Sequence, residues 1–195
     1  MATKDHQSEP IESASETLQR IFDGHGSVLG SQMADESSRY DVLKKTDFPK
    51  PQRTRRIAVA NQKGGVGKTT STVNTAAALA NKGAQVLVID MDPQGNASTA
   101  LGVSHASGEP SVYDVIEGRS DLGDVITVCP DFPTLDVVPA SIDLSGAELE
   151  VADLPNRNTL LKEALDLYLR QSDKHYDYVF IDCPPSLGLL VINAM

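Results

Sequence analysis

Lys63-Gly-Gly-Val-Gly-Lys-Thr-Thr70 is the stretch of this sequence that decides its fold. A short apolar run, residues 57–60, lies just before it and is typical of a buried strand. After it, residues 69–82 carry apolar side chains at helical spacing, and Gly83 marks the end of the predicted helix. A strand, a glycine-rich loop and a helix in this order predict a loop that binds phosphate groups.

The residue types of this loop suit a triphosphate with its metal ion. Its glycines let the backbone approach phosphate oxygens and point amide N–H groups at them. Lys68 supplies a charge for the β and γ phosphates, Thr69 a hydroxyl for Mg²⁺, and Thr70 a further phosphate contact. The predicted nucleotide-binding residues are Gly64, Gly65, Val66, Gly67, Lys68, Thr69 and Thr70.

The loop departs from the common GxxxxGK[ST] pattern at its start. Gln62 stands where that pattern has its first glycine, and Lys63 follows. A second lysine has no clear use if Lys68 already serves the phosphates of the same site. If Lys63 points toward the nucleotide of a partner subunit, it would stabilise charge that develops on the γ-phosphoryl group. We therefore predict a dimer with shared active sites.

Two other interpretations of the glycines are weaker. Gly65, Gly67 and Asp90 nearly match the dinucleotide fingerprint GxGxxG/A with an acid about twenty residues later. Its third position, however, holds Thr70, where close helix packing requires Gly or Ala. A purely structural glycine turn gives no reason for the two flanking lysines.

Acidic residues follow two further apolar strands. Asp90 ends the predicted strand 86–89, Asp92 lies just beyond it, and Asp182 ends the predicted strand 178–181. Asp182 is placed to hold Mg²⁺ through a water, Asp92 to orient the attacking water, and Asp90 to serve the metal shell or fix its loop. The alternative is that these acids only cap helices or start turns. The carboxyl ends of strands in one sheet are where such folds bind ligands.

The rest of the pattern predicts an α/β domain with a mainly parallel sheet flanked by helices. Further strands are expected at 125–129 and 135–138, and helices at 112–116 and 158–170. Residues 1–52 are polar and are predicted to be a disordered or partly helical tail, with one short helix behind Pro10. The ATPase domain is expected at 53–195. Its last residues, 187–195, read as a helix without a stop signal, so we expect a domain incomplete at its C-terminus.

Composition narrows the class of protein. The net charge of -10 disfavours a nucleic-acid coat protein but allows a local basic patch. Cys129 and Cys183 lack the spacing of a zinc site or a disulfide framework. No apolar stretch has the length of a membrane span, and the N-terminus is not a secretory signal. We expect a cytoplasmic protein that does not bind membranes.

Three motifs together resemble the ParA/Soj family of partitioning ATPases, from about Arg55 to the last residue. Residues 63–70 look like the family's deviant Walker A motif, and 88–96 (Val-Ile-Asp-Met-Asp-Pro-Gln-Gly-Asn) like its Walker A-prime motif. Residues 180–188 (Phe-Ile-Asp-Cys-Pro-Pro-Ser-Leu-Gly) look like its Walker B motif. The resemblance implies a P-loop fold of the deviant Walker A type.

The resemblance also implies a function. Lys63 would reach the other subunit's ATP, Lys68 and Thr69 would hold phosphate and Mg²⁺, Asp92 would serve hydrolysis and Asp182 the metal's water shell. It implies an ATP-dependent homodimer that binds DNA non-specifically, associates with the nucleoid and is stimulated by a ParB-type centromere-binding partner. Three alternatives stay open: a MinD-like division-site ATPase, a reductase with an iron–sulfur cluster between subunits, and a non-catalytic fragment of a partitioning ATPase.

Overall fold

The computed structural model describes residues 28–46 and 48–195, and the chain divides into two compact units, Met1–Phe48 and Pro49–Met195. The described part of the first unit holds one helix, α2 (Val28–Lys45). The apolar residues of α2 do not gather on one side, so the periodicity of the sequence did not predict it. The short helix expected behind Pro10 lies outside the described residues.

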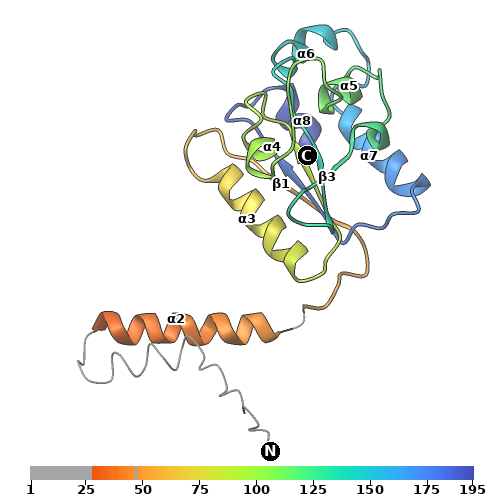
Figure 1. The fold of residues 1–195 in the computed structure, drawn as a ribbon. Coiled ribbons are helices and arrows are strands. Elements are labelled where there is room, and N and C mark those ends of the chain that lie inside the picture. Colours follow the sequence, from red (N-terminus) through yellow and green to blue (C-terminus); the bar gives the residue numbers. More distant parts are fainter. Residues whose placement is uncertain (1–27, 47) are drawn as a thin grey trace, which may run out of the picture. The chain divides into compact units, whose positions relative to one another are not determined.

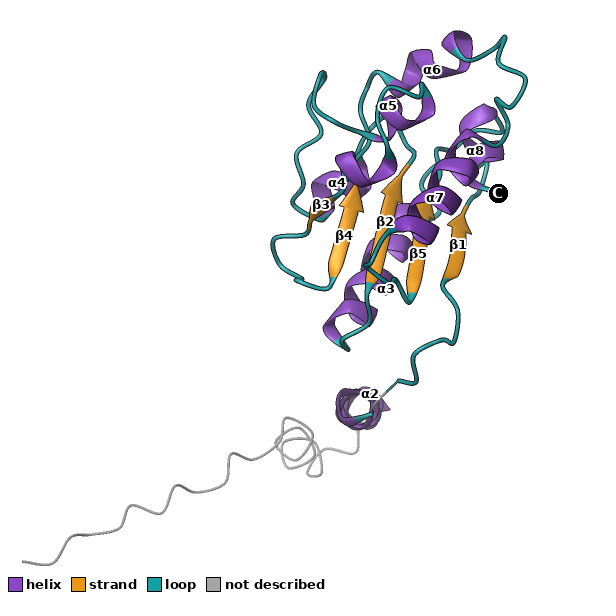
Figure 2. Cartoon of the chain, turned by 90° about the vertical axis from the view of Figure 1, so that its right-hand side faces the viewer, coloured by secondary structure: helices purple, strands orange, loops and turns teal. Residues whose placement is uncertain are grey.

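Within the described residues, the second unit contains a five-stranded sheet (Figure 2). Its strands are β1 (Arg55–Val59), β2 (Val86–Asp90), β3 (Thr127–Val128), β4 (Leu135–Val138) and β5 (Tyr178–Asp182). They lie in the order β1-β5-β2-β4-β3. All neighbouring pairs are parallel except β3 and β4. The predicted α/β class with a mainly parallel sheet is thereby confirmed.

Helices connect these strands and cover both faces of the sheet (Figure 1). They are α3 (Lys68–Asn81), α4 (Asn96–Ala100), α5 (Val112–Ile116), the 3-10 helix η1 (Leu122–Val125), α6 (Leu144–Glu150), α7 (Leu160–Gln171) and α8 (Leu189–Ala194). In the described part of the chain, no helix combines the length and the apolar character that a membrane span requires.

Strand β2 lies at the centre of the core, and its alternate residues pack on opposite faces. Leu87 and Ile89 join the cluster that α5, α7 and α8 cover. Val86 and Val88 join the cluster that α3 covers. All five residues of β2 are buried, which explains why its sequence is a continuous apolar run rather than an alternating one.

The register of the sheet places the carboxyl ends of β1, β5 and β2 side by side at one edge. Asp182 at the end of β5 pairs with Val59 at the end of β1 and with Asp90 at the end of β2. The glycine loop leaves β1 at this edge of the sheet and leads into α3. The two acids and the loop therefore meet because β5 lies between β1 and β2.

Two differences from the sequence prediction concern the middle of the chain. The strand expected at 125–129 is replaced by η1 and by the two-residue β3, which is exposed and runs antiparallel to β4. Helices α4 and α6 were not predicted, because both are short and carry fewer large apolar side chains than α5, which is equally short but was predicted.

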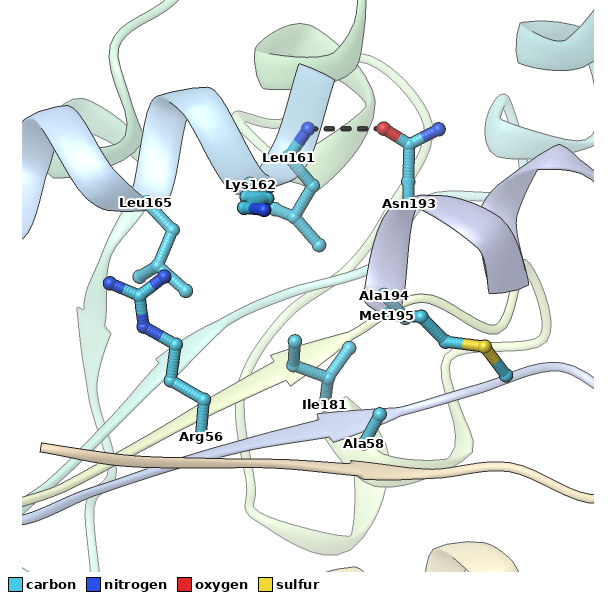
Figure 3. A pocket seen from close by; sticks show the side chains of 9 residues that line it. All are labelled: Arg56, Ala58, Leu161, Lys162, Leu165, Ile181, Asn193, Ala194 and Met195. Carbon is cyan, nitrogen blue, oxygen red and sulfur yellow. Dashed lines mark hydrogen bonds between the residues drawn. The ribbon is translucent and has the colours of Figure 1, made fainter. Parts of the chain in front are cut away.

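Asn193 joins α8 to the start of α7, as Figure 3 shows. Its Oδ1 accepts a hydrogen bond from the amide of Leu161 (3.2 Å), which has no partner within the helix at this position. Its Nδ2 donates to the carbonyl oxygens of Arg157 (2.7 Å) and Leu189 (3.1 Å). Since α8 follows β5, this buried amide fixes the segment that comes after Asp182.

A small cavity of about 150 Å³ lies beside Asn193, between β1, α7 and α8 (Figure 3). Arg56 lines it and forms a salt bridge with Asp166 of α7 at 2.5 Å. None of the predicted site residues lines this cavity.

The burial of Leu87 at the centre of the core predicts how much its truncation destabilises the fold. Leu87 is fully buried in the core, so Leu87→Ala should lower the free energy of unfolding by about 2–5 kcal/mol. Urea unfolding followed by circular dichroism measures this loss. The matched control is Leu149→Ala, because Leu149 is 84% exposed, and its effect should stay within about 0.5 kcal/mol. Equal losses in the two variants would contradict this account of the core.

Candidate nucleotide site

The loop between β1 and α3 needs glycine for its backbone conformation. Gly65 has φ 70° and Gly67 has φ 88°, in the left-handed region that other residues rarely adopt. A Cβ atom at either position would meet no other atom within 4 Å, so crowding is not the reason for glycine here. Helix α3 begins directly after Gly67, so its free N-terminal amides and its positive end lie at the loop.

A cavity of about 520 Å³ opens at this loop. It is lined by Gly64, Gly65, Gly67, Lys68, Thr69, Thr70, Asp92, Gln94, Asn96 and Pro185. The structure therefore brings most of the predicted loop residues together with Asp92. Lys63 and Val66 belong to the loop but do not line the cavity, and both side chains are exposed.

Asp182 is buried at the end of β5 and is held by two threonines of α3. Thr69 Oγ1 donates a hydrogen bond to Asp182 Oδ2 at 2.6 Å, and Thr72 Oγ1 donates to Oδ1 at 3.1 Å. Burial raises the pKa of this carboxyl group above its usual value, and the nearby charge of Asp92 acts in the same direction. The two hydroxyls and Lys68 oppose the rise in pKa because they stabilise the ionised form.

Asp90 is fully buried and serves as an acceptor for the loop that follows it. Its Oδ1 accepts from the amide of Asp92 (3.1 Å), and its Oδ2 accepts from the amide and the hydroxyl of Ser98 (2.8 Å each). Burial raises its pKa to about 6, although these hydrogen bonds lower it. Two roles were considered for Asp90: to fix the loop or to serve the metal shell. Since both of its oxygens already accept hydrogen bonds from the protein, the geometry favours the first role.

Asp92 lies at the rim of the cavity and shapes a tight turn. Its Oδ1 accepts from the amide of Gln94 at 3.0 Å, and its carbonyl oxygen accepts from the amide of Gly95 at 2.9 Å. The side chain is 8% exposed, so it is nearly buried but still lines the cavity. A carboxylate in this place has one oxygen fixed by the backbone, which orients the group toward the cavity.

The two lysines of the loop lie in different surroundings. Lys68 is partly buried, lines the cavity, and its Nζ lies 3.5 Å from the carbonyl oxygen of Lys63. The amide of Lys63 donates to Asn61 Oδ1 at 2.9 Å, which fixes the backbone, while its side chain is exposed. The charge of Lys63 is thus available outside the cavity of its own chain.

The donor set beside the loop suits Mg²⁺. The Thr69 hydroxyl and the Asp182 carboxylate are hard oxygen ligands in direct contact with each other. Mg²⁺ binds such groups through one or two protein oxygens and keeps several waters. Thr69 and Asp182 thus lie where they could serve Mg²⁺ together, while both oxygens of Asp90 accept hydrogen bonds from the protein. The metal roles of all three residues stay predictions.

Sequence reasoning missed Thr72, Gln94, Asn96 and Pro185. A helix turn places Thr72 on the same face as Thr69, so the spacing of the two threonines was a usable signal. Gln94 and Asn96 lie in the motif that was quoted for Asp92, but no pattern separates polar residues that face a cavity from those that face water. Pro185 lines the cavity through the path of the chain after Asp182.

Cys183 is fully buried behind Asp182. Burial raises the pKa of its thiol to about 11, so the thiolate that an iron–sulfur cluster requires is disfavoured. This burial argues against the reductase alternative, which needs an accessible cysteine at a subunit interface.

Comparison with known proteins gives one family model, described as an AAA domain, which matches residues 54–195. The chain is similar to the sporulation initiation inhibitor protein Soj of Bacillus subtilis, with 50% identity over 71% of the chain and 53% of Soj. It is also similar to the chromosome partitioning protein ParA of Caulobacter vibrioides, with 48% identity over 71% of the chain and 51% of ParA. The chain thus spans about half the length of the curated relatives it matches.

A solved structure from Mycobacterium smegmatis has the same fold over most of this chain. It is described as cobyrinic acid a,c-diamide synthase with bound ADP and magnesium, and it is 41% identical with a TM-score of 0.65. The match covers 72% of this chain and 55% of that protein. A nucleotide and Mg²⁺ are thus bound by a protein that shares the fold.

The contact between Thr72 and Asp182 can be tested by a substitution of equal shape. Thr72→Val removes the hydroxyl but keeps the volume, leaving a buried carboxylate oxygen without this donor, so the free energy of unfolding should fall by about 1–3 kcal/mol. Urea unfolding measures the change. Thr127→Val is the matched control because Thr127 is exposed in β3. A Thr72→Val variant as stable as this control would show that the hydroxyl does not support Asp182.

Proposed function

The chain belongs to the ParA/Soj group of AAA-domain proteins, and on this premise we propose that it is the nucleotide-binding part of a partitioning ATPase that hydrolyses ATP. One observation carries the proposal. A glycine loop, the N-terminus of α3 and Asp92 line one cavity. Asp182 contacts Thr69 of the cavity wall through a hydrogen bond, and the side chain of Lys63, a second lysine of the loop, is exposed. This combination suits a triphosphate whose γ-phosphoryl group is transferred to water.

In the proposed complex, the loop amides and the N-terminus of α3 bind the phosphate oxygens. Lys68 adds positive charge within the cavity, and Thr70 contributes a further polar contact. Thr69 and Asp182 hold Mg²⁺, which neutralises negative charge on the phosphates when it is bound. Gln94 and Asn96 line the same cavity and offer further polar contacts to the nucleotide.

Asp92 is proposed to orient the water that attacks the γ-phosphoryl group. The hydrogen bond from Gln94 occupies Oδ1 and leaves Oδ2 without a protein donor among the described contacts. Nearly complete burial limits the water that can compete for this oxygen. Catalysis of this kind depends on positioning and on electrostatic stabilisation rather than on covalent chemistry of the protein.

Lys63 is proposed to act on the ATP of a partner subunit. Its exposed side chain does not line the cavity of its own chain, which supports a role across an interface. An ATP-dependent homodimer would bring such a lysine to the phosphates of the other subunit. There it would stabilise charge on the γ-phosphoryl group.

Non-specific DNA binding and a ParB-type partner complete the proposal. A relative of this chain is called a chromosome partitioning protein, and this name is what supports DNA as the partner. The net charge of -10 means that a DNA surface would be a local basic patch of the whole assembly. Stimulation of a slow ATPase by DNA together with a centromere-binding partner is the expected behaviour.

The role of Asp92 predicts a separation of binding from turnover. Asp92→Ala should bind ATP with Mg²⁺ as the parent chain does, while kcat should fall about 10²- to 10⁴-fold because the attacking water loses its acceptor. Binding is measured with a fluorescent ATP analogue, and turnover by phosphate release with DNA and a partner present. The matched control is Asp173→Ala, an exposed acid before β5. Normal turnover in Asp92→Ala would refute the assignment.

The role of Lys63 predicts a loss of association. Lys63→Ala should lose ATP-dependent dimerisation while each monomer still binds nucleotide through Lys68, since the substitution removes only the charge that faces the partner. Light scattering after size-exclusion chromatography, with and without ATP, measures the dimer. Lys162→Ala removes another exposed lysine and should change nothing. If Lys63→Ala dimerises as before, the trans-acting lysine is excluded.

A further inference from the structure

A histidine from outside the cavity packs on the turn that carries Asp92. This Asp92 turn comprises residues 92–95 and ends at Gly95. A methyl group added to the Cα atom of Gly95 would lie 2.5 Å from His105 Nδ1 and 2.6 Å from its Cε1. Such distances are too short for real Cβ atoms, so the imidazole ring lies directly on the glycine backbone. The Nε2 atom of the same ring lies 2.8 Å from Thr99 Oγ1.

Gly95 therefore meets two separate requirements. Its φ of 63° lies in the left-handed region, which favours glycine. In addition, the His105 ring occupies the space that a Cβ atom at this position would need. Gly102, by comparison, also has a positive φ, but an added Cβ there would lie at an ordinary 3.5 Å from Pro130. The close approach at Gly95 is thus a feature of this turn and not of every glycine turn in the chain.

The Asp92 turn is supported from the inside by Asp90. The carboxylate of Asp90 accepts from the amide of Asp92 at one end and from Ser98, beyond the turn, at the other. Ser98 Oγ also accepts from the amide of Ala140, which connects the turn to the chain after β4. Asp90 and Ser98 therefore fix the turn to the sheet, and His105 contacts it separately at Gly95.

The segment that presents His105 has its own anchors. The His105 loop comprises residues 103–109, and its Glu109 accepts from the hydroxyl of Ser104 (2.6 Å) and the amide of Ala106 (3.2 Å). The hydroxyl of Ser107 donates to both oxygens of Asp143, at 3.2 and 3.1 Å. The ring is thus carried by an organised loop, so it can transmit a restraint to the turn it contacts.

We propose that His105 is a positioning residue that holds the Asp92 turn so that Asp92, Gln94 and Asn96 face the nucleotide. All three residues line the cavity, whereas His105 does not, so it acts through the turn and without touching the nucleotide. The inference that His105 restrains the turn rests on the contacts of His105 and does not depend on the proposed function. The inference that His105 affects ATP turnover rests on the proposed function of Asp92.

The test measures the turn and the reaction separately in the full chain. His105→Ala should speed hydrogen exchange of the Gln94 and Gly95 amides, both bonded to Asp92, about tenfold. It should lower kcat about tenfold to a hundredfold because a displaced Asp92 harms the transition state. KM should rise by a smaller factor, because the contacts of Gln94 and Asn96 are disturbed while the phosphate loop keeps its place. His105→Phe keeps a flat ring on Gly95 and should restore most of the protection. His175→Ala, whose side chain is 65% exposed before β5, is the control and should change neither quantity.

A double variant tests the contact itself. Gly95→Ala alone should disturb the turn because the new methyl group displaces the ring, and part of this effect should disappear in the His105→Ala background. Unchanged exchange in His105→Ala, a His105→Phe variant that behaves like His105→Ala, or additive effects of the two substitutions would each overturn the proposal. If exchange rises in His105→Ala but Asp92→Ala turns over normally, the positioning of the turn stands and the proposed role of Asp92 fails.

Discussion

The buried carboxylate of Asp182 is the point at which the sheet, the loop helix and the metal ligands meet. It ends the strand between β1 and β2 and accepts hydrogen bonds from Thr69 and Thr72 on α3. A buried carboxylate without donors is strongly destabilising, so these two hydroxyls set how α3 is rotated against the sheet. That rotation in turn decides where the free amides at the start of α3 point. The geometry of the phosphate loop is thus coupled to one side chain on a strand that lies far away in the sequence.

The site gathers negative charge in a place where water is scarce. Burial raises the pKa of both Asp90 and Asp182, which means that each carboxylate is ionised at a cost in free energy. Asp90 offsets part of this cost with three protein donors that also shape the loop after β2. Asp182 has two, and a divalent cation beside it would favour its ionised form. This buried negative charge therefore favours the binding of a divalent cation together with its nucleotide.

The sequence predicted the parts of this fold that have a strong local signal. Apolar runs predicted the strands that end in Asp90 and Asp182, and the glycine loop predicted the start of α3. The signal was absent where the structure depends on partners elsewhere in the chain. Helix α4 has no large apolar side chain, α2 has no apolar side, and the exposed β3 is defined only by its pairing with β4.

The same limit applies to the residues of the site. Lys68, Thr69 and Asp92 could be predicted because their motif fixes their positions relative to the loop. Thr72 and His105 could not be assigned roles, because their contacts join segments that only the folded chain brings together. The helical spacing of Thr69 and Thr72 indicates that they share one face of α3. Only the folded structure shows that this face contacts Asp182. For His105, no local pattern predicts that a ring will lie on Gly95.

The strand order also has a consequence for how the chain acquires its structure. Strands β1 and β2 are made early, yet they are not neighbours, because β5 inserts between them and pairs with both. The nascent chain must therefore keep a gap in its sheet until the residues of β5 emerge, and non-local pairing of this kind is slow and exposes strand edges. Asp182 arrives on that inserted strand. The loop, Asp90 and Asp182 come together only when β5 pairs with both β1 and β2, so the carboxylates proposed to serve the site are assembled by this one non-local pairing.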